Sequence, residues 1–153
     1  MEPSHTFTQA SVYWDDFTVG DSWRTRGRTI TEPDLVAFLN LSWITEELFT
    51  NHHDRPNSAI AGRLVPGSMV FACAEGLTLA AVNIKGFAFL HSDVDMRRAT
   101  FLGDTIHVVS SVVELRAATK PDRGLCRTRN EVVNQHGEPV LVYTALRLLE
   151  KRR

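Results

Sequence analysis

Residues 69–82 carry almost no charge, and they constrain the fold more than any other part of the chain. This stretch is rich in Ala, Leu and Met, and Glu75 is its one charged residue. A helix that is apolar on all sides belongs in the interior of a protein, so these residues predict a long buried helix. Gly76, beside the carboxylate, indicates that this helix packs closely against another element.

The segments around this helix have the character of β-strands. Residues 21–29 predict a first strand, and Thr31 to Asp34 has the cap chemistry of a short helix start. After the long helix, four segments rich in Val, Phe, Thr and Leu predict strands at residues 87–96, 105–115, 125–133 and 140–149. An antiparallel sheet wrapped around one apolar helix buries that helix economically. We therefore expect an α+β fold and a single domain over residues 1–153.

Composition excludes several classes of partner. The formal net charge is −1 with 43% hydrophobic residues, so no strong field attracts nucleic acid or an anionic membrane. No apolar run approaches the ~20 residues that span a bilayer. The first ten residues are polar and lack the apolar segment of a signal peptide, so we expect a cytoplasmic protein. Cys73 and Cys126 belong to no metal-binding spacing, and neither a metal nor another cofactor is expected.

Several short motifs, in order along the chain, resemble the MaoC-like dehydratase and (R)-specific enoyl-CoA hydratase family. The motifs are Tyr-Trp-Asp-Asp-Phe at 13–17, Gly-Arg-Thr-Ile-Thr-Glu at 27–32, Gly-Arg-Leu-Val-Pro-Gly at 62–67 and Gly-Asp-Thr at 103–105. The resemblance implies a hotdog fold, a homodimer, and addition or removal of water on a CoA or carrier-protein thioester. It also implies that amides at the start of the long helix, at Gly67 and Ser68, polarise the thioester carbonyl. This is sound physically, because helix N-terminal amides favour the negative charge that develops on that oxygen.

The family's catalytic pair is an Asp with a His five positions later. Counted without gaps from Phe38, these positions fall on Ile44 and Phe49, which cannot move a proton. A three-residue insertion places Glu47 and His52 at that spacing instead, followed by Asp54, and these residues could share a water as general acid and base. Both alignments stay open. Arg63 and Arg97 are the candidate side chains for binding the substrate.

Two other functions remain alternatives. Glu75 follows Gly67 by eight positions, a spacing that resembles some hotdog thioesterases, and its carboxylate could attack a thioester or activate water. It could instead be a structural carboxylate paired across the dimer, for example with an arginine, since an unpaired buried charge is costly. The second alternative is an acyl-thioester-binding module that kept the pocket and lost the catalytic pair.

Overall fold

The computed structural model describes residues 9–51, 53 and 61–153. Its elements, in chain order, are η1 (Trp14–Asp16), β1 (Ser22–Arg24), β2 (Arg28–Thr29), α1 (Glu32–Ser42), α2 (Glu47–Thr50), β3 (Leu64–Val65), α3 (Gly67–Ala81), β4 (Gly86–His91), β5 (Val94–Met96), β6 (Thr100–Phe101), β7 (Thr105–Ala117), β8 (Arg123–Val133) and β9 (Pro139–Glu150).

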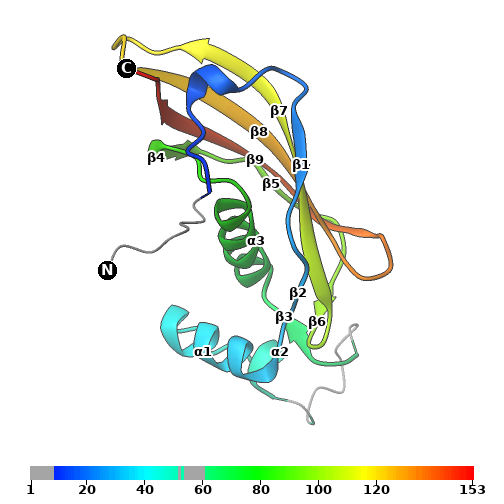
Figure 1. Ribbon diagram of the computed structural model, residues 1–153. Helices are drawn as coiled ribbons and strands as arrows, with labels where there is room; N and C mark the ends of the chain where they lie inside the picture. Colours follow the sequence, from blue (N-terminus) through cyan, green and yellow to red (C-terminus); the bar gives the residue numbers. More distant parts are fainter. Residues whose placement is uncertain (1–8, 52, 54–60) are drawn as a thin grey trace, which may run out of the picture.

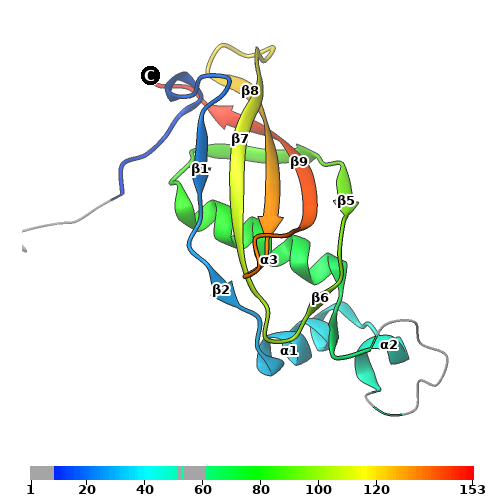
Figure 2. The same cartoon turned by 90° about the vertical axis from the view of Figure 1, so that its right-hand side faces the viewer.

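The main sheet is antiparallel and curves over α3 (Figure 1). Its strands follow the order β1-β7-β8-β9-β4, with β2 paired to β7 and β5 paired to β9. Strands β3 and β6 form a separate two-stranded ladder. Seen through the sheet, α3 runs across the strands, while α1 and α2 lie beyond one end of it (Figure 2). The predicted arrangement of one long helix wrapped by an antiparallel sheet is confirmed.

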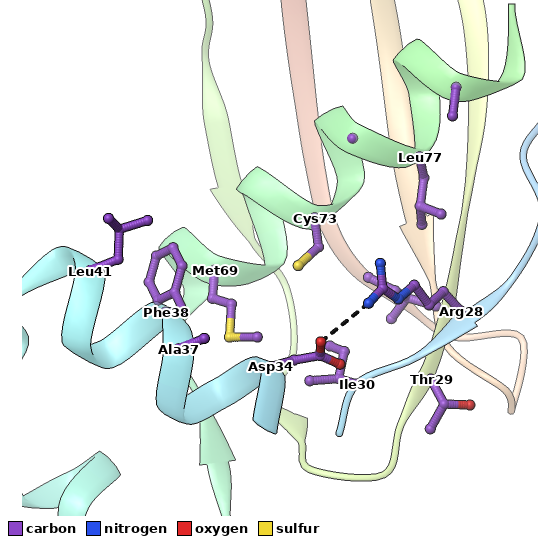
Figure 3. Close-up of a pocket in the computed structure, with 13 residues that line it drawn as sticks. Arg28, Thr29, Ile30, Asp34, Ala37, Phe38, Leu41, Met69, Cys73 and Leu77 are labelled. Atoms are coloured by element: carbon purple, nitrogen blue, oxygen red, sulfur yellow. Dashed lines mark hydrogen bonds and ion pairs between the residues drawn. The ribbon is translucent and has the colours of Figure 1, made fainter. Parts of the chain in front are cut away.

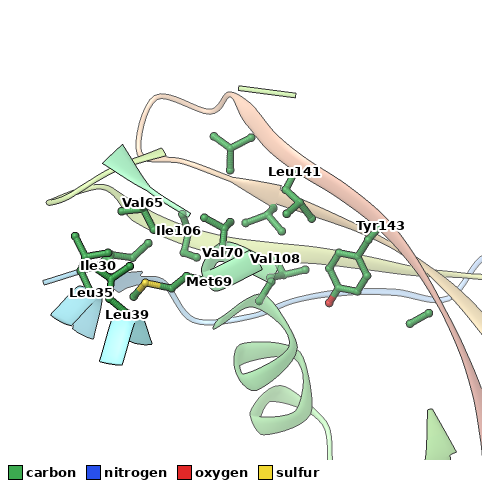
Figure 4. Close-up of a cluster of buried hydrophobic side chains, with 14 residues drawn as sticks. Ile30, Leu35, Leu39, Val65, Met69, Val70, Ile106, Val108, Leu141 and Tyr143 are labelled. Carbon is green, nitrogen blue, oxygen red and sulfur yellow. The ribbon is translucent and has the colours of Figure 1, made fainter. Parts of the chain in front are cut away.

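The predicted long helix begins two residues earlier than expected and ends at Ala81. Its buried residues are Met69 and the series Val70, Ala74 and Thr78, which are spaced four apart on one side of the helix. Met69, Val70 and Ala74 join a core cluster with residues of α1, β7 and β9, including Leu35, Ile106, Val108 and Tyr143 (Figure 4). The opposite face of α3 is open within the described residues, since Ala72, Gly76, Leu79 and Ala80 are exposed. The prediction that α3 is buried on all sides is therefore wrong for this face.

Two predicted strands are each divided in two. Residues 21–29 form β1 and β2 because Thr25 interrupts the ladder: its hydroxyl accepts a hydrogen bond from the Val108 amide. Residues 87–96 form β4 and β5 because the chain turns at Asp93, whose carbonyl accepts a hydrogen bond from the Thr144 amide. Within the described part of the chain, no helix is long and apolar enough to cross a membrane.

The predicted start of α1 is confirmed in its chemistry. Asp34 Oδ2 accepts hydrogen bonds from both the amide and the hydroxyl of Thr31. These bonds hold the pKa of the Asp34 carboxyl below its usual value. The two hydrogen bonds from Thr31 to Asp34 thus fix the N-terminal turn of α1.

Candidate functional site

A pocket of about 350 Å³ lies at the start of α3. Its lining includes Gly67, Phe49, Met96 and Arg97. The residue before the helix is Pro66, which makes no capping hydrogen bond. Within the described residues, the Gly67 and Ser68 amides meet no protein acceptor, while the next two amides donate to the Pro66 carbonyl. The start of α3 therefore presents unused donors and the positive end of a helix dipole.

Gly67 lies close to the end of the Met96 side chain. A Cβ at this position would lie 2.7 Å from the Met96 methyl carbon, so a larger residue would displace the flexible Met96 side chain. Gly67 and Ser68 both lie where the sequence places them, in the first turn of α3.

The proposed proton-transfer residues fall on or after α2. Glu47 is the first residue of α2, and its side chain is exposed. Phe49 lines the pocket, and Ile44 packs against the core. His52 and Asp54 lie outside the described residues. Of the two alignments, the described residues place the gapless Phe49, rather than Glu47, against the start of α3.

Arg63 and Arg97 have different environments. The Arg63 guanidinium donates to the Phe49 carbonyl and forms an ion pair of 2.6 Å with Glu32. It thereby ties α1 and α2 to the strand that precedes α3. Arg97 borders the pocket, is about half exposed and pairs with Asp95 at 2.7 Å. Arg97 remains a candidate for binding a substrate phosphate, whereas the observed contacts of Arg63 hold the protein together.

Glu75 is enclosed by hydrogen-bond donors. The Arg147 guanidinium contacts both of its carboxylate oxygens, at 2.7 and 2.6 Å, and the Tyr143 hydroxyl donates to one of them at 2.6 Å. The side chains of Arg147 and Glu75 are 12% and 16% exposed. This geometry agrees with the expected structural carboxylate, but the expected pairing across the dimer is not what is found, because the arginine belongs to the same chain.

Tyr143 and Arg147 were not anticipated from the sequence. Both lie on β9, four residues apart, where side chains share one face of the strand. A usable signal was present: an arginine in an otherwise apolar strand and a lone carboxylate in an apolar helix each require a partner.

A larger cavity, of about 520 Å³, lies between α1, β2 and α3. Figure 3 shows Phe38 and Leu41 of α1 facing Met69, Cys73 and Leu77 of α3 across it. The half-buried Cys73 thiol has a raised pKa because burial disfavours its thiolate. The Arg28–Asp34 ion pair lies at the edge of this cavity, with a separation of 3.2 Å.

A long helix wrapped by an antiparallel sheet is the arrangement of a hotdog fold. No protein-family model matches the sequence, and no curated protein matches it. Solved structures do match. The monoamine oxidase regulatory protein from Archaeoglobus fulgidus is 25% identical with a TM-score of 0.87, over 96% of this chain and 100% of that one.

Two further structures are similar at lower identity. A putative MaoC domain protein dehydratase from Chloroflexus aurantiacus is 23% identical with a TM-score of 0.90, over 97% of this chain but only 43% of that protein. The (R)-hydratase PhaJ1 from Pseudomonas aeruginosa is 20% identical with a TM-score of 0.76, over 92% and 86% of the two chains. The resemblance to MaoC-like dehydratases and (R)-hydratases seen in the motifs is thus confirmed in the fold.

Proposed function

We propose that this protein is a hydratase or dehydratase of acyl thioesters, adding water to an enoyl thioester or removing it from a hydroxyacyl one. The observation that carries the proposal is the uncapped start of α3, where Gly67 lines a pocket and the Gly67 and Ser68 amides meet no acceptor among the described residues. A thioester carbonyl bound there would receive these two donors as its oxygen gains enolate character. The names of the similar dehydratase and hydratase structures point to the same chemistry.

Proton transfer is assigned to the first residue of α2 and to the segment that follows this helix. Glu47 and His52 would act as general base and general acid toward the water, and Asp54 would orient the histidine. The support is their mutual spacing in the sequence and the attachment of α2 beside the pocket through the Arg63–Phe49 hydrogen bond. Arg97, at the pocket edge, would meet a phosphate of CoA or of a carrier-protein arm.

The proposed assembly is a homodimer. Strand β4 is exposed along its whole length, and Phe87, Phe89 and Leu90 on it are between 43% and 52% exposed. A sheet edge of this kind presents unpaired backbone groups and apolar side chains. Pairing of β4 with β4 of a second copy would cover both.

A second candidate function is binding of an acyl thioester without chemistry. It is favoured by the position of Phe49, which contributes an apolar ring where a hydratase needs a proton carrier. The exposure of Glu47 points the same way.

Incubation with crotonyl-CoA, followed by both enoyl absorbance and free thiol, separates these functions. A hydratase removes the enoyl band and releases no thiol. His52→Ala and Glu47→Ala should then slow hydration by about 100-fold or more, as loss of a general acid or base does. Glu46→Ala is the matched control and should keep the rate.

Release of free thiol would instead show thioester hydrolysis and would favour Glu75 as the catalytic residue. If neither signal is seen while crotonyl-CoA still binds, the protein is a binding module. Full activity of both His52→Ala and Glu47→Ala would refute their assignment.

A further inference from the structure

Polar side chains lie between the two apolar clusters that form the core. One cluster includes Val108 of β7, and the other includes Val112 of the same strand. Between these two valines the inward-facing residue of β7 is Ser110, and β8 places Asn130 directly opposite it. Ser110 and Asn130 are both 0% exposed. The middle of the sheet therefore buries polar groups on the face where its neighbours on β7 are apolar.

The orientation of the Asn130 amide is fixed by its neighbours. Its nitrogen donates to the Thr128 hydroxyl at 3.1 Å and to the Tyr143 carbonyl at 3.4 Å. Because a backbone carbonyl can only accept a hydrogen bond, the atom that faces Tyr143 must be the nitrogen. The Asn130 Oδ1 atom takes part in neither bond, and it is buried without a hydrogen-bond partner among the described residues.

Two more buried polar atoms adjoin Asn130 and also have no partner in the part of the chain that the structure describes. They are the Ser110 hydroxyl oxygen and the Trp23 indole nitrogen. Trp23 of β1 pairs in register with Ser110, and Ser110 pairs with Asn130. These three residues form a polar row across β1, β7 and β8. Three adjacent buried groups without partners would be costly to the fold, so the polar row calls for a ligand that satisfies them.

The three atoms match the hydrogen-bonding capacity of one water molecule. Asn130 Oδ1 can only accept, the Trp23 indole N–H can only donate, and the Ser110 hydroxyl can do either. Side chains directly opposite each other on paired strands have Cβ atoms about 5 Å apart, a gap that one bridging water can span. The polar row carries no charge of its own, so an ion bound there would be poorly compensated.

We propose that the polar row of Trp23, Ser110 and Asn130 is a binding site for one internal water molecule. The water donates to Asn130 Oδ1, accepts from the Trp23 indole and completes a third bond with the Ser110 hydroxyl. It links β1, β7 and β8 through their side chains, in addition to the backbone ladders. This site is independent of the proposed hydratase function and of the pockets beside α3.

Crystal structures of the wild type, Ser110→Ala and Ser110→Val test the site. The wild type should show a water within hydrogen-bond distance, about 2.7–3.2 Å, of both Ser110 Oγ and Asn130 Oδ1. Ser110→Ala keeps the space and two of the three partners, so the water should remain. Ser110→Val fills the space with methyl groups and should lose the water.

A measurement in solution complements the crystal structures. The nuclear Overhauser effect from water to the Trp23 indole proton should be present in the wild type and in Ser110→Ala, and lost in Ser110→Val. Persistence in Ser110→Ala excludes the Ser110 hydroxyl proton as the source of the signal.

Thr25→Val is the matched control. Thr25 is also buried in this sheet, but its hydroxyl already donates to the Arg26 carbonyl and accepts from the Val108 amide. The water and its signal at Trp23 should therefore be unchanged in Thr25→Val. A direct bond between Ser110 Oγ and Asn130 Oδ1 in the wild type, with no water beside them, would overturn the proposal. A water that persists in Ser110→Val, or a signal that disappears in Ser110→Ala, would overturn it as well.

Discussion

Glu75 and Glu47 are the two candidate catalytic carboxylates on helices, yet they have opposite environments in the fold. Glu75 lies in the middle of the fifteen-residue α3 and is held by Arg147 and Tyr143. Glu47 begins the four-residue α2, and no described residue pairs with its exposed carboxylate. Of the two, the buried carboxylate is therefore held by the fold, and the exposed one is the candidate for chemistry.

This contrast follows from the elements that carry the two residues. A long helix packed under a sheet directs each of its positions toward a fixed neighbour, so a charge on it must find a partner there. The exposed first residue of a four-residue helix meets no such requirement. Burial alone is thus a poor guide to a catalytic carboxylate in this protein, and the contacts of the carboxylate decide.

The largest expected effect comes from removing the partner of Glu75. Arg147→Ala would leave a buried carboxylate without its counterion, which costs about 3–5 kcal/mol of unfolding free energy. Urea denaturation followed by circular dichroism measures this loss.

A surface ion pair provides the control. Arg127 pairs with Glu114 at 2.8 Å, but Glu114 is 37% exposed. Arg127→Ala should therefore cost no more than about 1 kcal/mol. Equal losses in the two variants would mean that Glu75 is solvated, like Glu47, and the contrast between them would disappear.

A smaller loss is expected at Tyr143. Tyr143→Phe removes one hydroxyl that donates to the Glu75 carboxylate, and a hydrogen bond to a charged group is worth about 1.5–3 kcal/mol. The ring itself is retained, so its edge-on contact with Phe71 at 4.9 Å should persist.

The same variant carries a pH signature. Burial, the hydrogen bond to Glu75 and the charge of that carboxylate raise the pKa of Tyr143. The folded protein therefore keeps this proton at pH values where the unfolded chain has lost it. The contribution of Tyr143 to stability is complete below about pH 10 and declines as the pH rises further. The stability difference between wild type and Tyr143→Phe should shrink above pH 10, and a constant difference up to pH 11 would contradict this account.

Local patterns allowed much of the fold to be predicted from the sequence. The uncharged run around Glu75 predicted α3, and the richness in Val, Leu and Thr predicted β7, β8 and β9, because these signals depend only on nearby residues. That Arg147 in particular is the partner of Glu75 could not be predicted, since it depends on the register with which β9 crosses α3. The predicted close packing at Gly76 is wrong among the described residues, because a Cβ there would meet no described atom within 4 Å and the residue adjoins a cavity.

Unlike Arg147→Ala and Tyr143→Phe, Gly76→Ala should stabilise the protein, by about 1 kcal/mol. Alanine is the better helix former, and its methyl group would enter open space. Thermal unfolding of the variant measures the gain. A loss of stability would mean that another chain packs against this face of α3, and the open face would then be an interface.

The smallest effect on stability, and the sharpest test of the comparison, belongs to Glu47. Because its side chain is exposed, Glu47→Ala should change the unfolding free energy by no more than about 0.5 kcal/mol. Hydration of crotonyl-CoA should nevertheless fall steeply if Glu47 acts on the water. If Glu47→Ala lowers the hydration rate but leaves the unfolding free energy unchanged, Glu47 serves the chemistry. If Arg147→Ala lowers both, Glu75 serves the fold. If the rate of crotonyl-CoA hydration is unchanged in Glu47→Ala, Glu47 is not the proton carrier. In the described part of the site, Phe49 would then stand where a proton carrier is needed, and the binding function would be better supported.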